Sequence, residues 1–266
     1  MGLVLRYLIE LKLFFGHLGK LWYFYKEFGN GFQLSNRDHG MIGAVSRFPW
    51  KILERGDQKH QRVLYDSGTF NVGFHHPKVG TEIIYVNGIC TTLHTAKMEA
   101  SLIAKELKRP VTLAYNETHG FWEDLYDCAR MRVRNKSDSE SQSLVEWIEA
   151  SYLSGIRTFM LIGYSQGSII VCHALDRLPE EIREKCTFEV LTFGAAQDEL
   201  KSYPNGHAVH VGHTGDFVAS TGAIHYWNRH KIYGRLVTTE ETDHNIFEYI
   251  TTMRAKDVLS DFASRL

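Results

Sequence analysis

The stretch that most constrains the fold of this chain is residues 158–175. An apolar, β-prone run from Thr158 to Ile162 leads into Gly163-Tyr164-Ser165-Gln166-Gly167, and an apolar helical pattern follows to Leu175. This order predicts a strand, a sharp turn and a helix. A serine between two glycines at the spacing G-x-S-x-G suits a strained turn, because a side chain at either glycine would collide with the neighbouring strand or helix.

Ser165 at such a turn would expose its Oγ at a helix N-terminus, where backbone N–H groups and the helix dipole favour a developing oxyanion. The bare pattern is short enough to occur by chance as a glycine-punctuated turn. In this chain, however, it reads G-Y-S-Q-G and resembles the nucleophile elbow of the α/β-hydrolase superfamily, in particular its lipase, esterase and cutinase-like members. The resemblance covers roughly Thr81 to the C-terminus. It implies an α/β-hydrolase fold with a mostly parallel central sheet, helices on both faces, and neither cofactor nor metal.

The composition fits that fold and argues against nucleic acid as a partner. With 266 residues, 44% of them apolar, the chain can bury one sizeable core. We expect an N-terminal amphipathic helix over residues 1–30 and a hydrolase domain over 31–266. The formal net charge of −1 provides no global field for nucleic acid. The four cysteines form no C-x-x-C pair, so neither a zinc site nor a disulfide framework is indicated.

The N-terminal segment has apolar residues at spacings of three and four, while Glu10 falls largely opposite them. The stripe consists of Val4, Leu8, Leu11, Phe15, Leu18, Trp22 and Tyr25. Interrupting charges argue against a secretory signal and against a membrane span. Three roles stay open: packing on the domain, peripheral membrane contact through residues 1–28, and binding to a partner helix. Without a signal peptide, we expect a cytoplasmic or membrane-peripheral protein.

Residues 81–86 predict a buried strand that ends at Asn87-Gly88-Ile89-Cys90, before a helix over Leu93–Leu107. Either this is an ordinary turn, or, as the resemblance implies, it is the first oxyanion loop. In that case the backbone N–H of Ile89 is the first donor, with Cys90 as the alternative, and the N–H of Gln166 is the second. Asn87 departs from the histidine that is more common before this glycine in the family.

The next strand, Val111–Tyr115, leaves the same sheet edge as the elbow strand if the sheet is parallel. Two helices, Phe121–Met131 and Ser139–Leu153, then complete a β-α-β-α-β order that favours a parallel sheet. Candidate pocket residues at this edge are Asn87, Cys90, Asn116, His119, Trp122 and Tyr164.

Two further patterns are weaker. A hairpin over residues 62–74 would begin the sheet with an antiparallel strand. Residues 86–89 and 115–120 are similar to uncharacterised proteins of chlamydia-like bacteria, and that similarity implies no activity.

The predicted triad acid follows the strand over residues 208–211. Thr192-Phe193-Gly194, after the preceding strand, and Gly215-Asp216-Phe217-Val218 resemble the T-F-G and D-x-V elements of lipases. The resemblance assigns the acid to Asp216, since a carboxylate there can orient a histidine on the next loop. Asp198 is the alternative.

Three histidines follow Asp216 and could act as the base: His225, His230 and His244. Triad order in this fold is serine, acid, histidine, with the histidine between the last strand and the last helical region. His244 lies between the predicted strand over 234–239 and the helix that begins at Ile246. Asp243-His244-Asn245 also resembles the D-H element of lipase-like hydrolases. His225, beside two aromatic residues, is expected to line the pocket or to lie on the surface.

Together these patterns predict a serine hydrolase that cleaves a small-molecule or lipid carboxylic ester through an acyl-enzyme on Ser165. Two other functions stay open. One is acyl transfer on the same triad, and the other is a non-catalytic binding protein with this fold. Acyl chain length, head group and oligomeric state depend on pocket shape and surfaces that spacing does not reveal.

Overall fold

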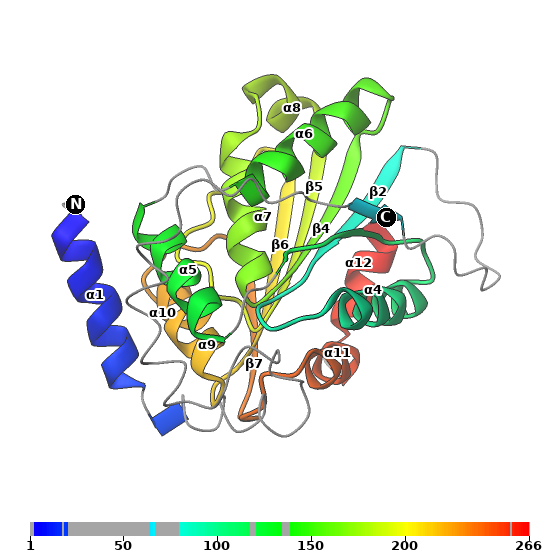
Figure 1. Cartoon of the computed structure of the whole chain (residues 1–266). Helices are drawn as coiled ribbons and strands as arrows, with labels where there is room; N and C mark the ends of the chain where they lie inside the picture. The colour runs from blue at the N-terminus through cyan, green and yellow to red at the C-terminus, as the bar shows by residue number, and fades with distance from the viewer. Residues whose placement is uncertain are drawn as a thin grey trace.

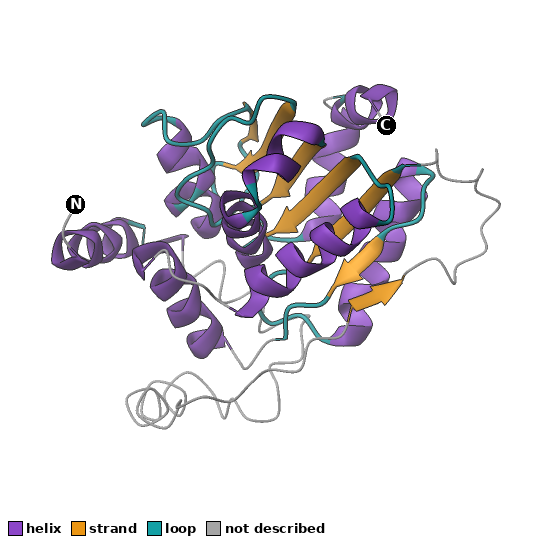
Figure 2. Cartoon of the chain, turned by 90° about the horizontal axis from the view of Figure 1, so that it is seen from above, coloured by secondary structure: helices purple, strands orange, loops and turns teal. Residues whose placement is uncertain are grey.

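The protein is built on one seven-stranded sheet with the strand order β1-β3-β2-β4-β5-β6-β7 (Figures 1 and 2). The computed structural model describes residues 3–17, 19–20, 64–66, 80–117, 121–134, 139–255 and 257–265. Its strands are β1 (Leu64–Asp66), β2 (Thr81–Val86), β3 (Thr112–Ala114), β4 (Thr158–Tyr164), β5 (Thr187–Phe193), β6 (Gly206–His213) and β7 (Arg235–Thr239). Strands β2 to β7 are parallel, and β1 pairs antiparallel with β3.

Helices cover both faces of this sheet, as predicted. Those on one face are α5 (Phe121–Arg134), α6 (Ser139–Leu153), α7 (Gln166–Arg177), α8 (Glu180–Lys185), α9 (Phe217–Thr221) and α10 (Ala223–Trp227). Those on the other face are α4 (Leu93–Leu107), α11 (Ile246–Ala255) and α12 (Val258–Arg265). Figure 2 shows the two helical layers on either side of the strands. The predicted α/β class with a mostly parallel sheet is therefore confirmed.

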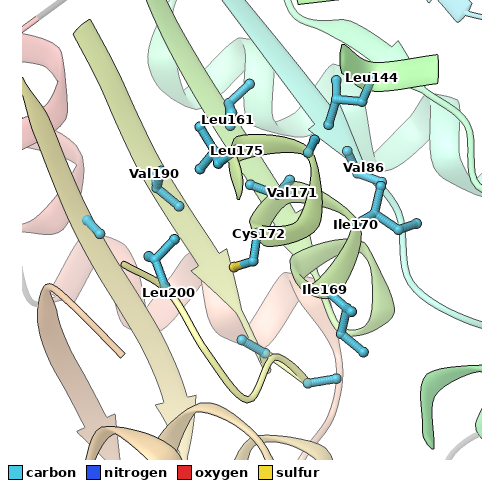
Figure 3. Close-up of a cluster of buried hydrophobic side chains, with 14 of the residues drawn as sticks. Val86, Leu144, Leu161, Ile169, Ile170, Val171, Cys172, Leu175, Val190 and Leu200 are labelled. Atoms are coloured by element: carbon cyan, nitrogen blue, oxygen red, sulfur yellow. The ribbon is translucent and has the colours of Figure 1, made fainter. Parts of the chain in front are cut away.

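The core follows from the alternation of side chains along each strand. In β2, Ile84 and Val86 point to the face covered by α7, whereas Ile83 and Tyr85 point to the face covered by α4. Figure 3 shows the first of these clusters, in which side chains of α7 pack on β4 and β5. Complete burial of such a side chain contributes roughly 1.5–3 kcal/mol, so these two layers hold the elbow strand in place.

The ends of α4 illustrate how local sequence sets an element. Thr92 caps the helix, with its Oγ1 accepting a hydrogen bond from the Thr95 N–H at 3.2 Å. Lys108 ends it in a left-handed conformation with φ of 53°. The bounds match the predicted helix over residues 93–107. Because β2 and α4 are well defined, the loop between them is fixed at both ends.

The predicted hairpin is described only in part. Residues 62–63 and 69–74 lie outside the described residues. The described piece, β1, pairs with β3 through Leu64 and Ala114, Tyr65 and Leu113, and Asp66 and Thr112. The expected antiparallel start of a mixed sheet is therefore present.

The chain order places a topological switch between β2 and β4. From β2 the chain moves outward to β3, and it then returns to β4 and continues in the other direction to β7. In open α/β sheets, ligands bind beyond the carboxyl ends of the strands at such a switch. The elbow after β4 and the loop after β2 both lie there.

Helix α1 (Leu3–Gly16) packs beside α5, as Figure 1 shows. Glu10 forms an ion pair with Arg132 at 3.1 Å and accepts a hydrogen bond from the Tyr226 hydroxyl at 3.0 Å. Leu13 is buried, and the Phe14 ring lies edge-on to Phe217 at 5.8 Å. The helix is therefore anchored to the domain.

Two residues of the predicted apolar stripe of α1 do not pack on the domain. Leu8 and Phe15, both in that stripe, are 56% and 63% exposed, while Glu10, predicted opposite it, contacts the domain. The reason is electrostatic, since the buried Arg132 guanidinium requires a carboxylate partner. The rest of the stripe cannot be placed: Leu18, Trp22 and Tyr25 lie outside the described residues, as do the side chains of Val4 and Leu11. None of the described helices combines the length and the apolar character needed to cross a bilayer.

Candidate active site

Ser165 occupies the turn between β4 and α7 in a strained backbone conformation, with φ of 53° and ψ of −119°. A Cβ at Gly163 would lie 2.6 Å from the Ser168 Cα, and one at Gly167 would lie 2.2 Å from the Val86 carbonyl oxygen. Only glycine fits at these two positions. The shape predicted for G-x-S-x-G is therefore present.

Hydrogen bonds on both sides hold this turn. The Ser165 N–H donates to the Phe193 carbonyl at 2.9 Å, which ties the turn to the end of β5. The Ser165 carbonyl accepts from the Ser168 N–H at 3.1 Å and from the Ser168 hydroxyl at 2.6 Å. The serine thus stands at the N-terminus of α7, where the first N–H groups have no partner within the helix.

Asp216 and His244 are paired and buried. The Nδ1 of His244 lies 2.6 Å from the Oδ2 of Asp216, and the two residues are 3% and 1% exposed. Asp216 also caps α9, because its Oδ1 accepts the Val218 N–H at 2.7 Å. An ionised carboxylate only accepts, so Nδ1 carries the proton and a neutral His244 keeps a lone pair on Nε2.

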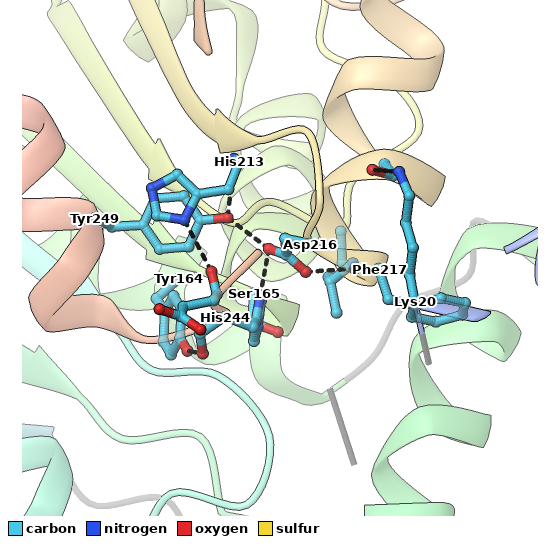
Figure 4. Close-up of polar contacts among 12 residues, drawn as sticks. Lys20, Tyr164, Ser165, His213, Asp216, Phe217, His244 and Tyr249 are labelled. Atoms are coloured by element: carbon cyan, nitrogen blue, oxygen red, sulfur yellow. Dashed lines mark hydrogen bonds and ion pairs between the residues drawn. The ribbon is translucent and has the colours of Figure 1, made fainter. Parts of the chain in front are cut away.

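The backbone around His244 is tied to the elbow and to β6. The Tyr164 hydroxyl donates to the His244 carbonyl at 2.6 Å, and the two rings stack at 5.0 Å. The Nδ1 of His213 lies 2.8 Å from the Asp243 carbonyl. A Cβ at Gly194 would lie 2.7 Å from the His244 Cε1, so the end of β5 also runs against this ring. Figure 4 places Ser165, Asp216 and His244 in one group.

Tyr249 completes the surroundings of the carboxylate. Its hydroxyl donates to the Asp216 Oδ2 at 2.5 Å and accepts the His213 N–H at 3.2 Å. The His213 and Tyr249 rings stack at 3.9 Å (Figure 4). Burial, and then the charge of Asp216, raise the pKa of Tyr249 well above its usual range, so the phenol keeps its proton.

Tyr249 and His213 are not among the residues predicted for the site. The available signal was weak: a tyrosine in the first turns of the helix that follows His244, and a histidine at the end of the strand before Asp216. The hydroxyl of Tyr164, a predicted pocket residue, holds the loop that carries His244.

The loop after β2 lies directly against the elbow. A Cβ at Gly88 would lie 2.8 Å from the Ser165 Cβ. The buried Asn87 amide donates to the Asn116 carbonyl at 2.9 Å and accepts the Asn116 N–H at 2.8 Å. The Asn116 amide in turn donates to the Gln166 Oε1 at 2.7 Å. Asn87 and Asn116 thus join the edges of three strands beside Ser165.

The backbone N–H of Cys90, the alternative oxyanion donor, already has a hydrogen-bond partner. Its backbone N–H donates to the Asp124 Oδ2 at 3.2 Å, with the residue at φ of 54°. This bond occupies the N–H that was the alternative oxyanion donor. Ile89 is left as the candidate donor of this loop.

The alternative acid and bases lie elsewhere. Asp198 interacts electrostatically with Glu10 and Arg132, whereas the carboxylate bound to His244 is that of Asp216. His225 packs against Tyr226, and burial, followed by Arg229 and Arg132, lowers its pKa to about 4. His230 is exposed. His119 lies outside the described residues, as does the side chain of Trp122. Within the described ranges, no three His, Cys, Asp or Glu side chains are grouped so as to hold a metal ion.

No protein-family model and no curated protein matches the sequence. Among solved structures, the chain is similar to the Francisella virulence factor BioJ, with 11% identity over 88% of this chain and 94% of that chain and a TM-score of 0.51. A Pyrobaculum calidifontis esterase matches with 10% identity over 87% and 94% of the two chains and a TM-score of 0.48. A Trichoderma reesei cutinase matches with 20% identity over 54% and 68% and a TM-score of 0.37.

Identity this low bears on the fold and not on the activity. The similarity to proteins of chlamydia-like bacteria is not tested by these matches and stays a prediction. The match in fold to BioJ extends over 88% of this chain, which is built on a mostly parallel sheet flanked by helices on both faces. The chain therefore has the α/β-hydrolase fold.

Proposed function

We propose that this protein is a serine hydrolase that cleaves carboxylic esters, with Ser165 as nucleophile, His244 as base and Asp216 as acid. The observation that carries the proposal is the buried 2.6 Å contact between the His244 Nδ1 and the Asp216 Oδ2 beside a strained serine turn. A histidine held in this tautomer can accept a proton at Nε2, as a serine nucleophile requires.

The proposed reaction has two halves. Ser165 Oγ attacks the ester carbonyl carbon and its proton passes to the His244 Nε2, while the carbonyl oxygen becomes an oxyanion. When the C–O bond breaks, the alcohol leaves with the proton from His244 and the acyl group stays on Ser165. Water then attacks the acyl-enzyme by the same route, which releases the acid and restores the serine. Asp216 stabilises the imidazolium in both halves.

The oxyanion would be bound by the backbone N–H groups of Ile89 and Gln166. The Gln166 N–H stands at the start of α7, where the helix dipole adds positive potential. Ile89 follows Gly88, which touches the elbow serine. The hydrogen bonds among Asn87, Asn116 and Gln166 link the loop after β2 to the start of α7, the two segments that carry these donors. A preorganised pair of this kind is typically the largest single contribution to acyl transfer.

The proposed substrate is a small-molecule or lipid ester. The lipase-like elements around Thr192 and Asp216 favour a carboxylic ester over an amide or thioester. Peripheral membrane contact stays a prediction for the N-terminal segment, in which Leu8 and Phe15 are exposed on α1.

A fluorophosphonate probe combined with p-nitrophenyl acyl esters tests the proposal. The folded protein should bind the probe and hydrolyse the esters, whereas Ser165→Ala should do neither. Ser154→Ala is the matched control, since that serine is exposed and bonds only within its own helix end.

Three outcomes would contradict the proposal. Labelling of the Ser165→Ala variant would exclude Ser165 as the nucleophile. Failure of the folded wild type to react with any probe or ester would favour a non-catalytic binding protein. If small amounts of added alcohol made the new ester, and not the free acid, the main product, the result would favour an acyltransferase.

A further inference from the structure

Tyr249 contacts the proposed triad of Ser165, His244 and Asp216 but has no role in the reaction described above. Its hydroxyl is buried and lies 2.5 Å from the Oδ2 of Asp216, the same oxygen that His244 Nδ1 approaches to 2.6 Å. One carboxylate oxygen thus receives two short hydrogen bonds. The other oxygen is bound by the Val218 N–H at 2.7 Å.

The direction of the Tyr249 hydrogen bond is fixed by its neighbours. The phenol oxygen accepts the backbone N–H of His213 at 3.2 Å, so its own proton points to Asp216. The His213 ring stacks on the Tyr249 ring at 3.9 Å with an interplanar angle of 11°. The His213 Nε2 lies 3.0 Å from the Thr252 Oγ1, which joins β6 to α11, the helix that carries Tyr249. The phenol therefore has little freedom to turn away.

We propose that Tyr249 is a positioning residue for catalysis, which sets how strongly Asp216 stabilises protonated His244. This inference rests on the proposed function of Ser165, His244 and Asp216. A hydrogen bond from a neutral phenol withdraws negative charge from the carboxylate oxygen that faces the imidazole. With the phenol in place, Asp216 orients His244 while attracting its proton less strongly than an unshared carboxylate would.

Titratable and charged groups approach the Asp216 carboxylate from several elements. They are His244, Tyr249, His213 of β6, Tyr164 of β4, Asp243 of the loop after β7, and Lys20, which donates to the Ser220 hydroxyl and the Thr214 carbonyl next to the Asp216 loop. Of these, only His244 and Tyr249 share the Oδ2 of Asp216. Removing the Tyr249 hydroxyl therefore alters the interaction between His244 and Asp216 more directly than it alters any other interaction among these groups.

Tyr249→Phe tests the inference through the pH profile of kcat/KM for p-nitrophenyl esters. Activity requires neutral His244, and an unshared Asp216 stabilises imidazolium better. The acid limb should move to higher pH by on the order of half a unit, a size typical of one hydrogen bond to a charged group. The plateau rate should fall roughly tenfold as the restraint on Asp216 is lost. The downfield proton resonance of the His244 Nδ1–H should shift as well.

Tyr85→Phe is the matched control. Its hydroxyl donates to the buried Glu99 carboxylate at 2.7 Å on the same face of the sheet, so the substitution removes an equivalent bond away from Asp216. That variant should lose stability but keep both the acid limb and the Nδ1–H resonance of the wild type.

A second variant keeps the test decisive if Tyr249→Phe fails to fold. Site-specific 3-fluorotyrosine at position 249 preserves the shape and makes the phenol a stronger donor, so the acid limb should move to lower pH, opposite to Tyr249→Phe. An acid limb that stays in place in a folded variant at position 249, with only the melting temperature changed, would overturn the inference. The proposed function would survive that result, because it fails only if ester turnover does not depend on Ser165.

Discussion

The fold contains two buried tyrosine–carboxylate pairs whose tyrosines, Tyr85 and Tyr249, both lie on the α4 side of the sheet, and the pairs differ in how the carboxylate is hydrogen-bonded. Glu99 of α4 receives the Tyr85 hydroxyl at 2.7 Å, and burial raises its pKa from 4.5 to about 7. Asp216 receives three donors, from His244, Tyr249 and the Val218 backbone. Both side chains are almost fully buried. The difference teaches that burial alone does not suit a carboxylate to the acid role proposed for Asp216, because that role also needs several directed donors that fix its orientation.

The largest effects are expected when the residues proposed to act together with Asp216, namely Ser165 and His244, are replaced. Ser165→Ala and His244→Ala should each lower kcat by on the order of 10⁶, and the double variant should lose little more, because residues that act as a unit are non-additive. Single-turnover assays on purified, folded variants measure this. If the two losses multiplied instead, the residues would not form one catalytic unit.

The contrast can be tested directly by neutralising each carboxylate. Asp216→Asn keeps the shape but favours the wrong imidazole tautomer, so kcat should fall by about 10⁴. Glu99→Gln should leave kcat within about twofold of the wild type, since Glu99 serves only its tyrosine and the packing of α4. Comparable losses in the two variants would show that the two pairs are not functionally distinct.

The raised pKa of Glu99 predicts how stability depends on pH. Between pH 4.5 and about 7 the folded chain holds a proton that the unfolded chain has released, so this contribution is present below pH 4.5 and is lost as pH rises through 7. The shift from 4.5 to about 7 corresponds to about 3 kcal/mol. Urea unfolding of wild type and Glu99→Gln across this range should show the wild type losing about that amount relative to the variant. A constant difference between the two would mean that Glu99 is ionised in the fold throughout.

The smallest effects are expected for histidines outside the Asp216 network. His225 has its pKa lowered to about 4 by burial and nearby cations, so it is neutral at pH 7, and His230 lies exposed in a turn. His225→Ala and His230→Ala should change kcat/KM less than threefold, because neither pairs with a described carboxylate of the site. A loss as severe as that of His244→Ala in either variant would move the base assignment away from His244.

Local patterns in the sequence predicted much of the fold. The bounds of α4 and α6 were predicted because caps and apolar periodicity act within a few residues. The elbow was predicted because the motif itself specifies glycine at positions 163 and 167, where any side chain would clash with neighbouring backbone. The pairing of β1 with β3 was not predicted, since a local pattern can indicate a strand but does not identify the distant strand that it pairs with.

The contacts that support the site could not be predicted from the sequence. Tyr249 lies 33 positions from Asp216, and nothing in its local pattern directs its hydroxyl to that carboxylate. The same limit applies to α1, where the pattern indicated a helix but not its packing face. Arg132, which determines that face, lies far along the chain, and only the folded structure brings its guanidinium to Glu10.

The contacts of the N-terminal segment also determine the timing of folding during synthesis. Glu10 bonds to a residue 216 positions later, and Lys20 to one 200 positions later. At roughly 5–20 residues per second, ribosomal synthesis needs tens of seconds to supply those partners. Throughout that interval part of the surface that covers Leu13 and Phe14 is absent, because Phe217 and α10 have not been made. The nascent chain therefore carries an incompletely covered apolar helix until its last third is translated.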